Sequence, residues 1–158
     1  MACCVSDLLG EQPLIRSGRE ANYEVGKDTG RFWDAGAANV HWVIATDDQI
    51  ELGIDEALSR VKAPGVIVEG NGFLEYIEAD TAVMCARADG GTIKRSARDA
   101  LLKSNFLYLS SLDQDSKGAR EQFQKWCANL KIDLSGYQLP ILTREDLPTL
   151  AAHLRTSQ

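Results

Sequence analysis

Apolar residues occur in short runs that are separated by polar and turn-forming stretches. β-Branched and aromatic residues fill Asn39 to Ala45, and nearly continuous apolar residues fill Gly65 to Gly70 and Thr81 to Ala86. Short runs of this kind predict strands, and runs without polar alternation are typical of a parallel sheet buried on both faces. Three further strands are predicted, at Leu14-Ile15, Asn105 to Leu109 and Leu139 to Leu142.

Between these runs, apolar residues recur at helical spacing. Thr46 followed by Gln49 is a capping-box pattern, and it predicts a helix that continues through Val61 and ends at Pro64. A second stripe predicts a helix between Ser116 and Leu130. Shorter helices are predicted after Asp28 with a stop at Gly36, from Ser96 to Lys103, and after Asp146 as the cap of a terminal helix.

The alternation of strands and helices predicts an α/β fold with a mostly parallel sheet and helices on both faces. Residues 1–158 contain no internal repeat, no low-complexity tract and no long Pro/Gly/Ser linker, so we expect one α/β domain over residues 1–158. Gly10 to Lys27 is rich in charge and turn formers and is predicted to be an extended loop around the short strand at Leu14-Ile15.

Composition narrows the class of protein. The chain has 158 residues with 17 Lys+Arg against 23 Asp+Glu, a formal net charge of −6, and 44% hydrophobic residues. That balance excludes a largely disordered chain and argues against sequence-independent duplex binding, which needs a broad basic field. No apolar run reaches the ~20 residues of a membrane span, and the first residues lack a secretory signal, so we expect a cytoplasmic protein.

The four cysteines match neither a zinc ribbon nor a disulfide framework, and we expect them to be free thiols. Cys85 and Cys127 are predicted to be core residues. Cys3 and Cys4 are adjacent, which leaves open either a soft-metal site or two thiols without a metal in a frayed or buried first segment.

Ligands of open α/β sheets bind beyond the carboxyl ends of the strands, so the residues after each apolar run are candidate site residues. Glu69 follows one run, and its carboxylate suits a hard cation or the orientation of a water, although it could equally cap or pair with a neighbouring element. The other candidate strand ends are Arg87 to Gly91, Ser110 to Asp113 and Thr143 to Glu145.

Standard catalytic motifs are missing from the sequence. There is no Gly-x-x-x-x-Gly-Lys-Ser/Thr, the pair Gly70 and Gly72 lacks the third glycine of a dinucleotide fingerprint, and there is no Gly-x-Ser-x-Gly. The two histidines, His41 in a predicted strand and His153 in the last helix, are expected to be structural or surface residues.

Three segments together resemble the later part of the molybdopterin-guanine dinucleotide biosynthesis adaptor family, whose members are P-loop nucleotide-binding proteins. These segments are Lys27 to Ala37, with its Lys-Asp-Thr-Gly-Arg beginning and its Ala-Gly-Ala end, the strand Val40 to Ala45, and Val66 to Asn71 with Val-Glu-Gly. The resemblance implies a P-loop NTPase-like three-layer sandwich that lacks its first strand and phosphate-binding loop.

The resemblance also implies a set of site residues. Asp28, Thr29 and Arg31 would lie near the phosphate end of a bound GTP, and Glu69 would orient Mg²⁺ or water. Asp113, which is all that Ser110-Ser111-Leu112-Asp113 keeps of the guanine-reading motif, would face the base.

Because backbone N–H groups and the lysine of the phosphate-binding loop supply most of the binding energy for a triphosphate, a chain without that loop is expected to be a poor NTPase. We therefore expect a nucleotide-binding adaptor that acts through a partner enzyme of metal-cofactor assembly. The strand missing from the sheet interior would leave edges open to a strand-complementing partner or to homo-oligomerisation.

Two other interpretations stay open at this point. The chain could be the C-terminal portion of a longer P-loop GTPase, or a non-catalytic interaction module that contacts a partner through Gly10 to Lys27 and through Phe32 and Trp33, two aromatic residues that we expect to be exposed. A less favoured hypothesis is metal-assisted hydrolysis by a carboxylate cluster of Glu69, Asp89 and Asp113.

Overall fold

The computed structural model describes residues 10–88, 94–110, 115–129 and 139–156. Contacts divide the chain into two compact units, Met1–Glu69 and Gly70–Gln158, each with its own sheet. One α/β domain over residues 1–158 stays a prediction. Among the described residues, no helix is long and apolar enough to cross a bilayer.

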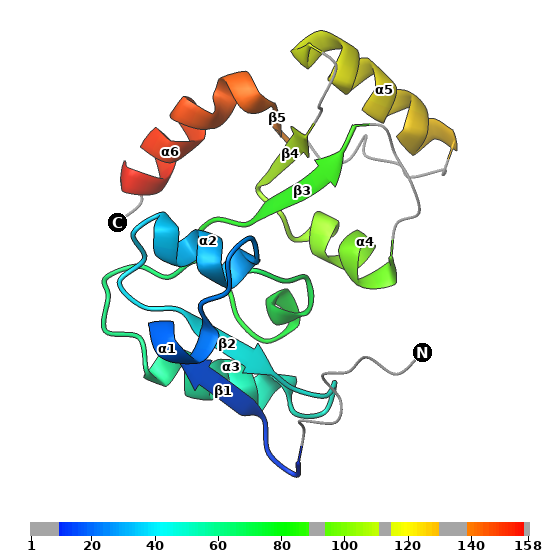
Figure 1. The fold of residues 1–158 in the computed structure, drawn as a ribbon. Coiled ribbons are helices and arrows are strands. Elements are labelled where there is room, and N and C mark those ends of the chain that lie inside the picture. Colours follow the sequence, from blue (N-terminus) through cyan, green and yellow to red (C-terminus); the bar gives the residue numbers. More distant parts are fainter. Residues whose placement is uncertain (1–9, 89–93, 111–114, 130–138, 157–158) are drawn as a thin grey trace. The chain divides into compact units, whose positions relative to one another are not determined.

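The first unit combines a two-stranded antiparallel sheet with three helices (Figure 1). Strand β1 pairs with β2 in a register that sets Leu14 opposite Ile44 and Ser17 opposite His41. In chain order the elements are β1 (Leu14–Ser17), α1 (Arg19–Asn22), α2 (Asp28–Asp34), β2 (His41–Ile44) and α3 (Ile50–Ser59).

Helix α3 packs closely on the β1–β2 sheet. A Cβ added at Gly53 would lie 2.9 Å from Val43 Cγ1 and 3.2 Å from Pro13 Cβ, so a glycine is required where the helix backbone approaches the strand. Ile44 and Ile54 are buried in this small core, at 4% and 7% exposure.

Asn22 connects the helices of the first unit to its strands. Its Nδ2 donates to Arg16 O at 3.0 Å and to Val40 O at 2.8 Å, and its Oδ1 accepts from Trp33 Nε1 at 2.8 Å. A buried amide is stable when its donors and acceptor are all satisfied, as they are here. Asn22 therefore holds α1, α2 and the beginning of β2 together.

The second unit contains a three-stranded parallel sheet in the order β3-β4-β5 (Figure 1). Cys85 of β3 lies opposite Tyr108 of β4, and Tyr108 lies opposite Leu142 of β5. In chain order the elements are the 3-10 turn η2 (Gly72–Glu75), β3 (Val83–Arg87), α4 (Arg95–Leu102), β4 (Phe106–Ser110), α5 (Ser116–Asn129), β5 (Ile141–Leu142), the 3-10 turn η3 (Arg144–Asp146) and α6 (Leu147–Thr156).

The central strand β4 supplies the core of the second unit. Leu107 and Leu109 are each 1% exposed, and they pack with Phe123 and Cys127 of α5 and with Leu101 of α4. The two leucines alternate with less buried neighbours, as the pleat of a strand requires. The predicted apolar stripe of α5 is confirmed at its Ala119, Phe123 and Cys127 positions, all of which are buried.

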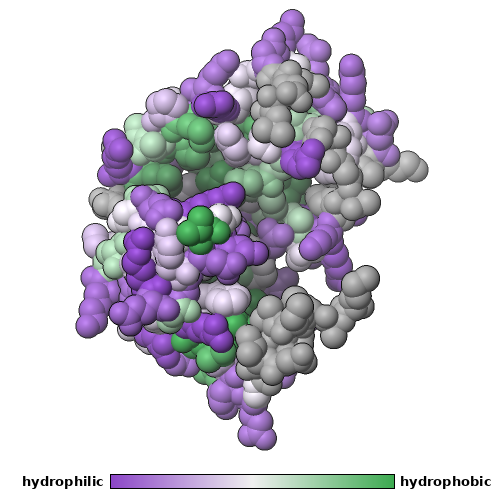
Figure 2. All heavy atoms as spheres, in the orientation of Figure 1, coloured by the Kyte–Doolittle hydropathy of each residue, from purple (hydrophilic) through white to green (hydrophobic). Residues whose placement is uncertain are grey.

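Hydrophilic residues cover much of the molecular face in Figure 2, and hydrophobic residues show among them in several places. Scattered apolar side chains are ordinary on a protein surface. The most exposed large ones in the described residues are Ile67 at 82% and Val25 at 81%.

The structure confirms a mixed α/β fold with a parallel sheet, and it corrects several details. Residues 65–69 form no strand, and Val66 and Ile67 are 54% and 82% exposed. An apolar run becomes a buried strand only where a neighbouring strand pairs with it, and no described strand does so here. The sheet of the first unit is antiparallel, so the parallel prediction holds only for the second unit.

Within the predicted loop from Gly10 to Lys27, the short strand at Leu14-Ile15 is confirmed as part of β1, whereas the helix α1 was not predicted. Phe32 and Trp33, predicted to be exposed, are half-buried, because Trp33 reaches inward to Asn22. Cys127 is buried as predicted, but Cys85 is exposed.

The predicted helix caps differ in their outcome. Asp28 is the first residue of α2, so the prediction that it caps this helix is wrong, and the cap position belongs to Lys27. Half of the predicted capping box at Thr46 is present, since Thr46 N donates to Gln49 Oε1 at 3.2 Å, but the Thr46 hydroxyl bonds Asp48 at 2.5 Å and α3 begins only at Ile50. Asp146 directly precedes α6, and it also closes a capping box with Thr143.

Candidate functional site

The three parallel strands of the second unit end at the same edge of their sheet. β3 ends at Arg87, β4 at Ser110, and β5 at Leu142, which Thr143 follows. Ala88 N donates to Ser110 O at 3.0 Å, so β3 and β4 stay hydrogen-bonded to each other up to the last residue of β4. This carboxyl edge is where open α/β sheets bind ligands.

Thr143 organises the chain after β5. It is 4% exposed; its backbone N–H and its hydroxyl bond Asp146 Oδ2 at 2.8 Å and 3.0 Å. Its Oγ1 is also hydrogen-bonded to Ser116 Oγ at 2.8 Å. Thr143 therefore joins the end of β5 to the first residue of α5, which fixes two segments of the carboxyl edge against each other.

Arg120 adds a cation to this network. Its Nη2 donates to Ile141 O at 3.0 Å and to Asp146 Oδ2 at 3.1 Å. The Thr143 backbone N–H and hydroxyl, and then Arg120, lower the pKa of Asp146 below its usual value. Arg120 Nε is buried and has no hydrogen-bond partner among the described residues.

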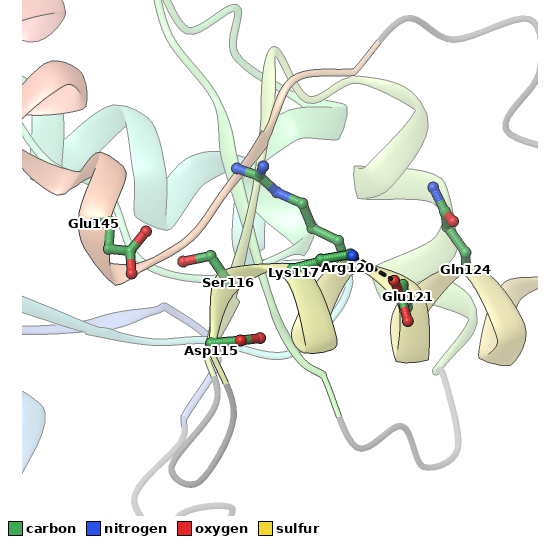
Figure 3. A pocket seen from close by; sticks show the side chains of 7 residues that line it. All are labelled: Asp115, Ser116, Lys117, Arg120, Glu121, Gln124 and Glu145. Carbon is green, nitrogen blue, oxygen red and sulfur yellow. Dashed lines mark ion pairs between the residues drawn. The ribbon is translucent and has the colours of Figure 1, made fainter.

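A hollow of about 450 Å³ lies beside this network, and Figure 3 shows the side chains around it. Every lining residue is polar or charged: Asp115, Ser116, Lys117, Arg120, Glu121, Gln124 and Glu145. Six of them come from the beginning of α5 and the residue before it, and Glu145 comes from the turn after β5. A hollow of this lining suits a small polar ligand with both hydrogen-bond donors and negative charge.

The charges around the hollow are partly paired. Lys117 Nζ lies 4.0 Å from Glu121 Oε1, and both side chains are more than half exposed. Asp115 caps α5, because its Oδ1 accepts from Gly118 N at 2.7 Å and its carbonyl oxygen accepts from Ala119 N at 3.0 Å. Such exposed charges reorganise readily, so Lys117 can turn from Glu121 to a bound anion.

The residues predicted from the sequence do not all meet in one place. Asp28 and Arg31 form an ion pair on α2, with Arg31 Nη1 3.3 Å from Asp28 Oδ1, and both side chains are exposed. Thr29, the residue after Asp28, is half-buried. Glu69 is exposed at the end of the first unit. Asp113, Asp89, Cys3 and Cys4 lie outside the described residues.

No group of three or more His, Cys, Asp or Glu side chains that could hold a metal ion occurs within the described ranges. The role of Glu69 as a Mg²⁺ ligand thus stays a prediction.

Sequence reasoning included Thr143 and Glu145 as a strand end but missed Ser116, Arg120 and Gln124. A signal for them exists in the sequence. They recur every four residues, which places them in one row along the helix, directly beside the apolar row of Ala119, Phe123 and Cys127. The polar residues that border the apolar stripe of a helix after a parallel strand therefore carry information that the strand ends alone do not.

Comparison with protein-family models, with curated proteins and with solved structures finds no match to this chain. The resemblance to the adaptor family accordingly stays a prediction that rests on the segments quoted above.

Proposed function

We propose that this protein is a nucleotide-binding accessory protein whose ligand occupies the polar hollow at the carboxyl edge of the β3-β4-β5 sheet. The observation that carries this proposal is the position of the hollow, between the helix α5 that follows β4 and the turn that follows β5, with a lining of polar and charged side chains only. A volume of about 450 Å³ is within the range of small-molecule sites.

The lining offers groups for both ends of a nucleotide. Lys117 and Arg120 supply positive charge for phosphate oxygens, and Glu145 and Asp115 supply carboxylates that accept from the N–H groups of a base. Asp113, expected to face guanine, precedes the lining residue Asp115 by two positions in the sequence. GTP is therefore the first ligand to test, and ATP is its natural comparison.

The finer parts of the proposal come from the family resemblance. They are a P-loop NTPase-like sandwich without its first strand and phosphate-binding loop, Mg²⁺ at Glu69, and Asp28, Thr29 and Arg31 near the phosphates. Hydrolysis is proposed to be weak or lost, since the sequence contains no Gly-x-x-x-x-Gly-Lys-Ser/Thr. The biological role would be assistance to a partner enzyme of molybdenum or other metal-cofactor biosynthesis.

Isothermal calorimetry of the full chain with GTP and Mg²⁺ tests the proposal. Lys117→Met should weaken binding by about 1.4- to fivefold, because one exposed charge pair contributes about 0.2–1 kcal/mol. Lys125→Met is the matched control, since Lys125 is an exposed lysine of the same helix that does not line the hollow. Asp113→Ala should reduce the preference for GTP over ATP.

A dissociation constant that is equal in the wild type, Lys117→Met and Lys125→Met would mean that the ligand binds outside the hollow. No heat with GTP or ATP at high micromolar protein would reject nucleotide binding altogether. GTP consumption at the rate of an ordinary GTPase would reject the proposed loss of hydrolysis.

A second candidate function, protein interaction, is favoured by the exposed segment of residues 65–69. Val66 and Ile67 have β-branched side chains and large exposed fractions, 54% and 82%. A partner with an open sheet edge would cover them by adding the segment as a strand. Ile67→Ser should then abolish complex or oligomer formation in size exclusion with light scattering, and a wild type that stays monomeric at all concentrations and alone in pull-downs would speak against this candidate.

A further inference from the structure

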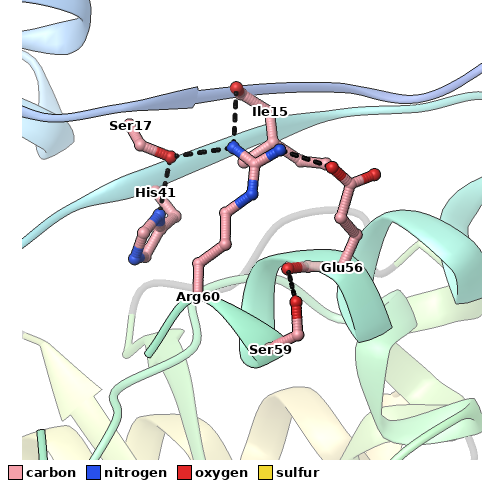
Figure 4. A network of polar contacts seen from close by, with 6 residues as sticks. All are labelled: Ile15, Ser17, His41, Glu56, Ser59 and Arg60. Atoms are coloured by element: carbon pink, nitrogen blue, oxygen red, sulfur yellow. Dashed lines mark hydrogen bonds and ion pairs between the residues drawn. The ribbon is translucent and has the colours of Figure 1, made fainter. Parts of the chain in front are cut away.

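Ser17 and His41 form a close pair in the first unit, separate from the hollow described above. They lie opposite each other in the β1–β2 register, and Ser17 Oγ is 2.8 Å from His41 Nδ1 (Figure 4). Both residues are half-buried, so solvent still reaches them. A hydroxyl within hydrogen-bond distance of an imidazole is the basic arrangement of a nucleophile and its general base.

Arg60 determines which atom of the pair carries the proton. Its Nη1 donates to Ser17 Oγ at 3.2 Å and to Ile15 O at 3.4 Å, and its Nη2 pairs with Glu56 (Figure 4). A guanidinium can only donate, so Ser17 Oγ is an acceptor toward Arg60. The Ser17 proton is then directed to His41 Nδ1, with the imidazole proton on Nε2.

The surroundings keep His41 in the form that accepts a proton. Partial burial, and then the positive charge of Arg60, lower the pKa of His41 from its ordinary value of 6.5. The imidazole is therefore neutral at pH 7. The charged groups in this network are Glu56 of α3 and its partner Arg60, the residue that caps the end of α3.

The backbone presents Ser17 at a sharp turn. Ser17 is the last residue of β1, and Gly18, with a φ of 89°, leads directly into α1. Nucleophilic serines of hydrolases stand at strand-to-helix turns, where the hydroxyl is accessible. The left-handed conformation at Gly18 makes this turn possible without strain.

We infer that Ser17 is a nucleophile toward activated acyl esters and that His41 acts as its general base. Ser17 Oγ would attack the ester carbonyl carbon and form an acyl–oxygen bond, while its proton passes to His41 Nδ1. The bond to the alcohol leaving group then breaks, and the leaving group takes the proton from His41. Water releases the acyl group as a carboxylic acid by the same proton path in reverse. Arg60, already beside Oγ, would stabilise the negative charge that develops on the carbonyl oxygen.

Acetylation of the full chain by p-nitrophenyl acetate, followed by peptide mapping with mass spectrometry, tests this inference. Ser59 is a matched internal control, because it is an exposed serine in the same network whose Oγ donates to Glu56 O at 2.7 Å and has no imidazole beside it. Mapping by peptide also separates Ser17 from thiols and lysines. We expect Ser17 to be acetylated at least about tenfold faster than Ser59, and His41→Phe to slow the Ser17 reaction by about a hundredfold.

The pH dependence is a readout that a structural role would not change. The acetylation rate of Ser17 should rise with pH as His41 loses its proton, with a midpoint below about 6.5, whereas that of Ser59 should show no such step. Equal acetylation of Ser17 and Ser59 in the wild type would overturn the inference, whether or not the His41→Phe chain folds. So would a Ser17 rate that is unchanged in a folded His41→Phe chain.

Discussion

Replacing Asn22 by alanine should strongly destabilise the first unit. The change removes both hydrogen bonds from Nδ2 to Arg16 O and Val40 O, and it leaves the Trp33 Nε1–H without its acceptor. Val40 O keeps a second donor, since Gly18 N reaches it at 3.3 Å. Arg16 lies opposite Trp42 in the β1–β2 ladder, which leaves its carbonyl oxygen a backbone donor. The expected loss therefore comes mainly from the Trp33 Nε1–H, which is left without an acceptor, together with the two bonds that Nδ2 no longer makes.

The magnitude follows from the net value of these contacts. A hydrogen bond contributes about 0.5–1.5 kcal/mol to stability, and a buried donor left unsatisfied costs about 1–3 kcal/mol. Trp33 is only half-buried, so water recovers part of that cost. The free energy of unfolding of the first unit should fall by about 2–4 kcal/mol, a large share of the roughly 5–15 kcal/mol of an ordinary domain.

Urea denaturation followed by tryptophan fluorescence measures this loss. A Trp126→Phe background removes the tryptophan of the second unit, so that Trp33 and Trp42 report on the first unit alone. Asn39→Ala is the matched control, because Asn39 is exposed and its Oδ1 accepts only from the adjacent Val40 N–H in the described contacts. A loss of no more than about 0.5 kcal/mol for Asn22→Ala, similar to the control, would refute the argument.

Three further substitutions test separate features of the fold. Gly30→Ala should destabilise the first unit by about 3 kcal/mol or more, because the new Cβ would lie 2.1 Å from Glu24 O. Gly10→Ala is the control, since a Cβ at Gly10 meets open space, and equal urea midpoints of the two variants would contradict the predicted clash. Leu107→Ala should lower the free energy of unfolding of the second unit by about 2–5 kcal/mol, since Leu107 is 1% exposed in the core. Thermal unfolding measures this loss, and Leu102→Ala, which changes a leucine that is 47% exposed, is the control and should have little effect. Because its network lowers the pKa of Asp146, the stability from this carboxylate is fully present above the ordinary Asp pKa and is lost as pH falls through the lower folded value. Asp146→Asn should therefore remove that part of the decline in the urea midpoint below about pH 4, and an identical pH profile in the variant would disprove it.

Local patterns predicted the elements of the second unit well, and long-range pairing explains the errors in the first. β3, α4, β4, α5 and β5 fall where apolar runs and stripes predicted them, because each of these elements is stabilised by its own buried face. Gly65 to Gly70 carries the same strand pattern as Thr81 to Ala86, but no described strand pairs with it. A pattern records what a segment can form, while pairing depends on the neighbours that the rest of the chain supplies.

The candidate site shows the same division. Thr143 and Glu145 were predicted because they follow a strand, and a strand end is visible in the sequence. Arg120 lies on the preceding helix, and its contacts with Ile141 O and Asp146 exist only once β5 has docked beside β4. Ser17 and His41 meet through the β1–β2 register, which was not predicted because the strand at Leu14-Ile15 was expected to end before Ser17 and its pairing partner was not identified.

The separation of the two sheets affects how the chain can fold during synthesis. Both strands of the β1–β2 pair are encoded before Gly70, and all three strands of the β3-β4-β5 sheet are encoded after it. Since the pairings of the described strands never join distant halves of the sequence, loop closure imposes only a modest entropic barrier on each sheet. The first sheet can therefore form on the ribosome while the codons for the second are still being translated.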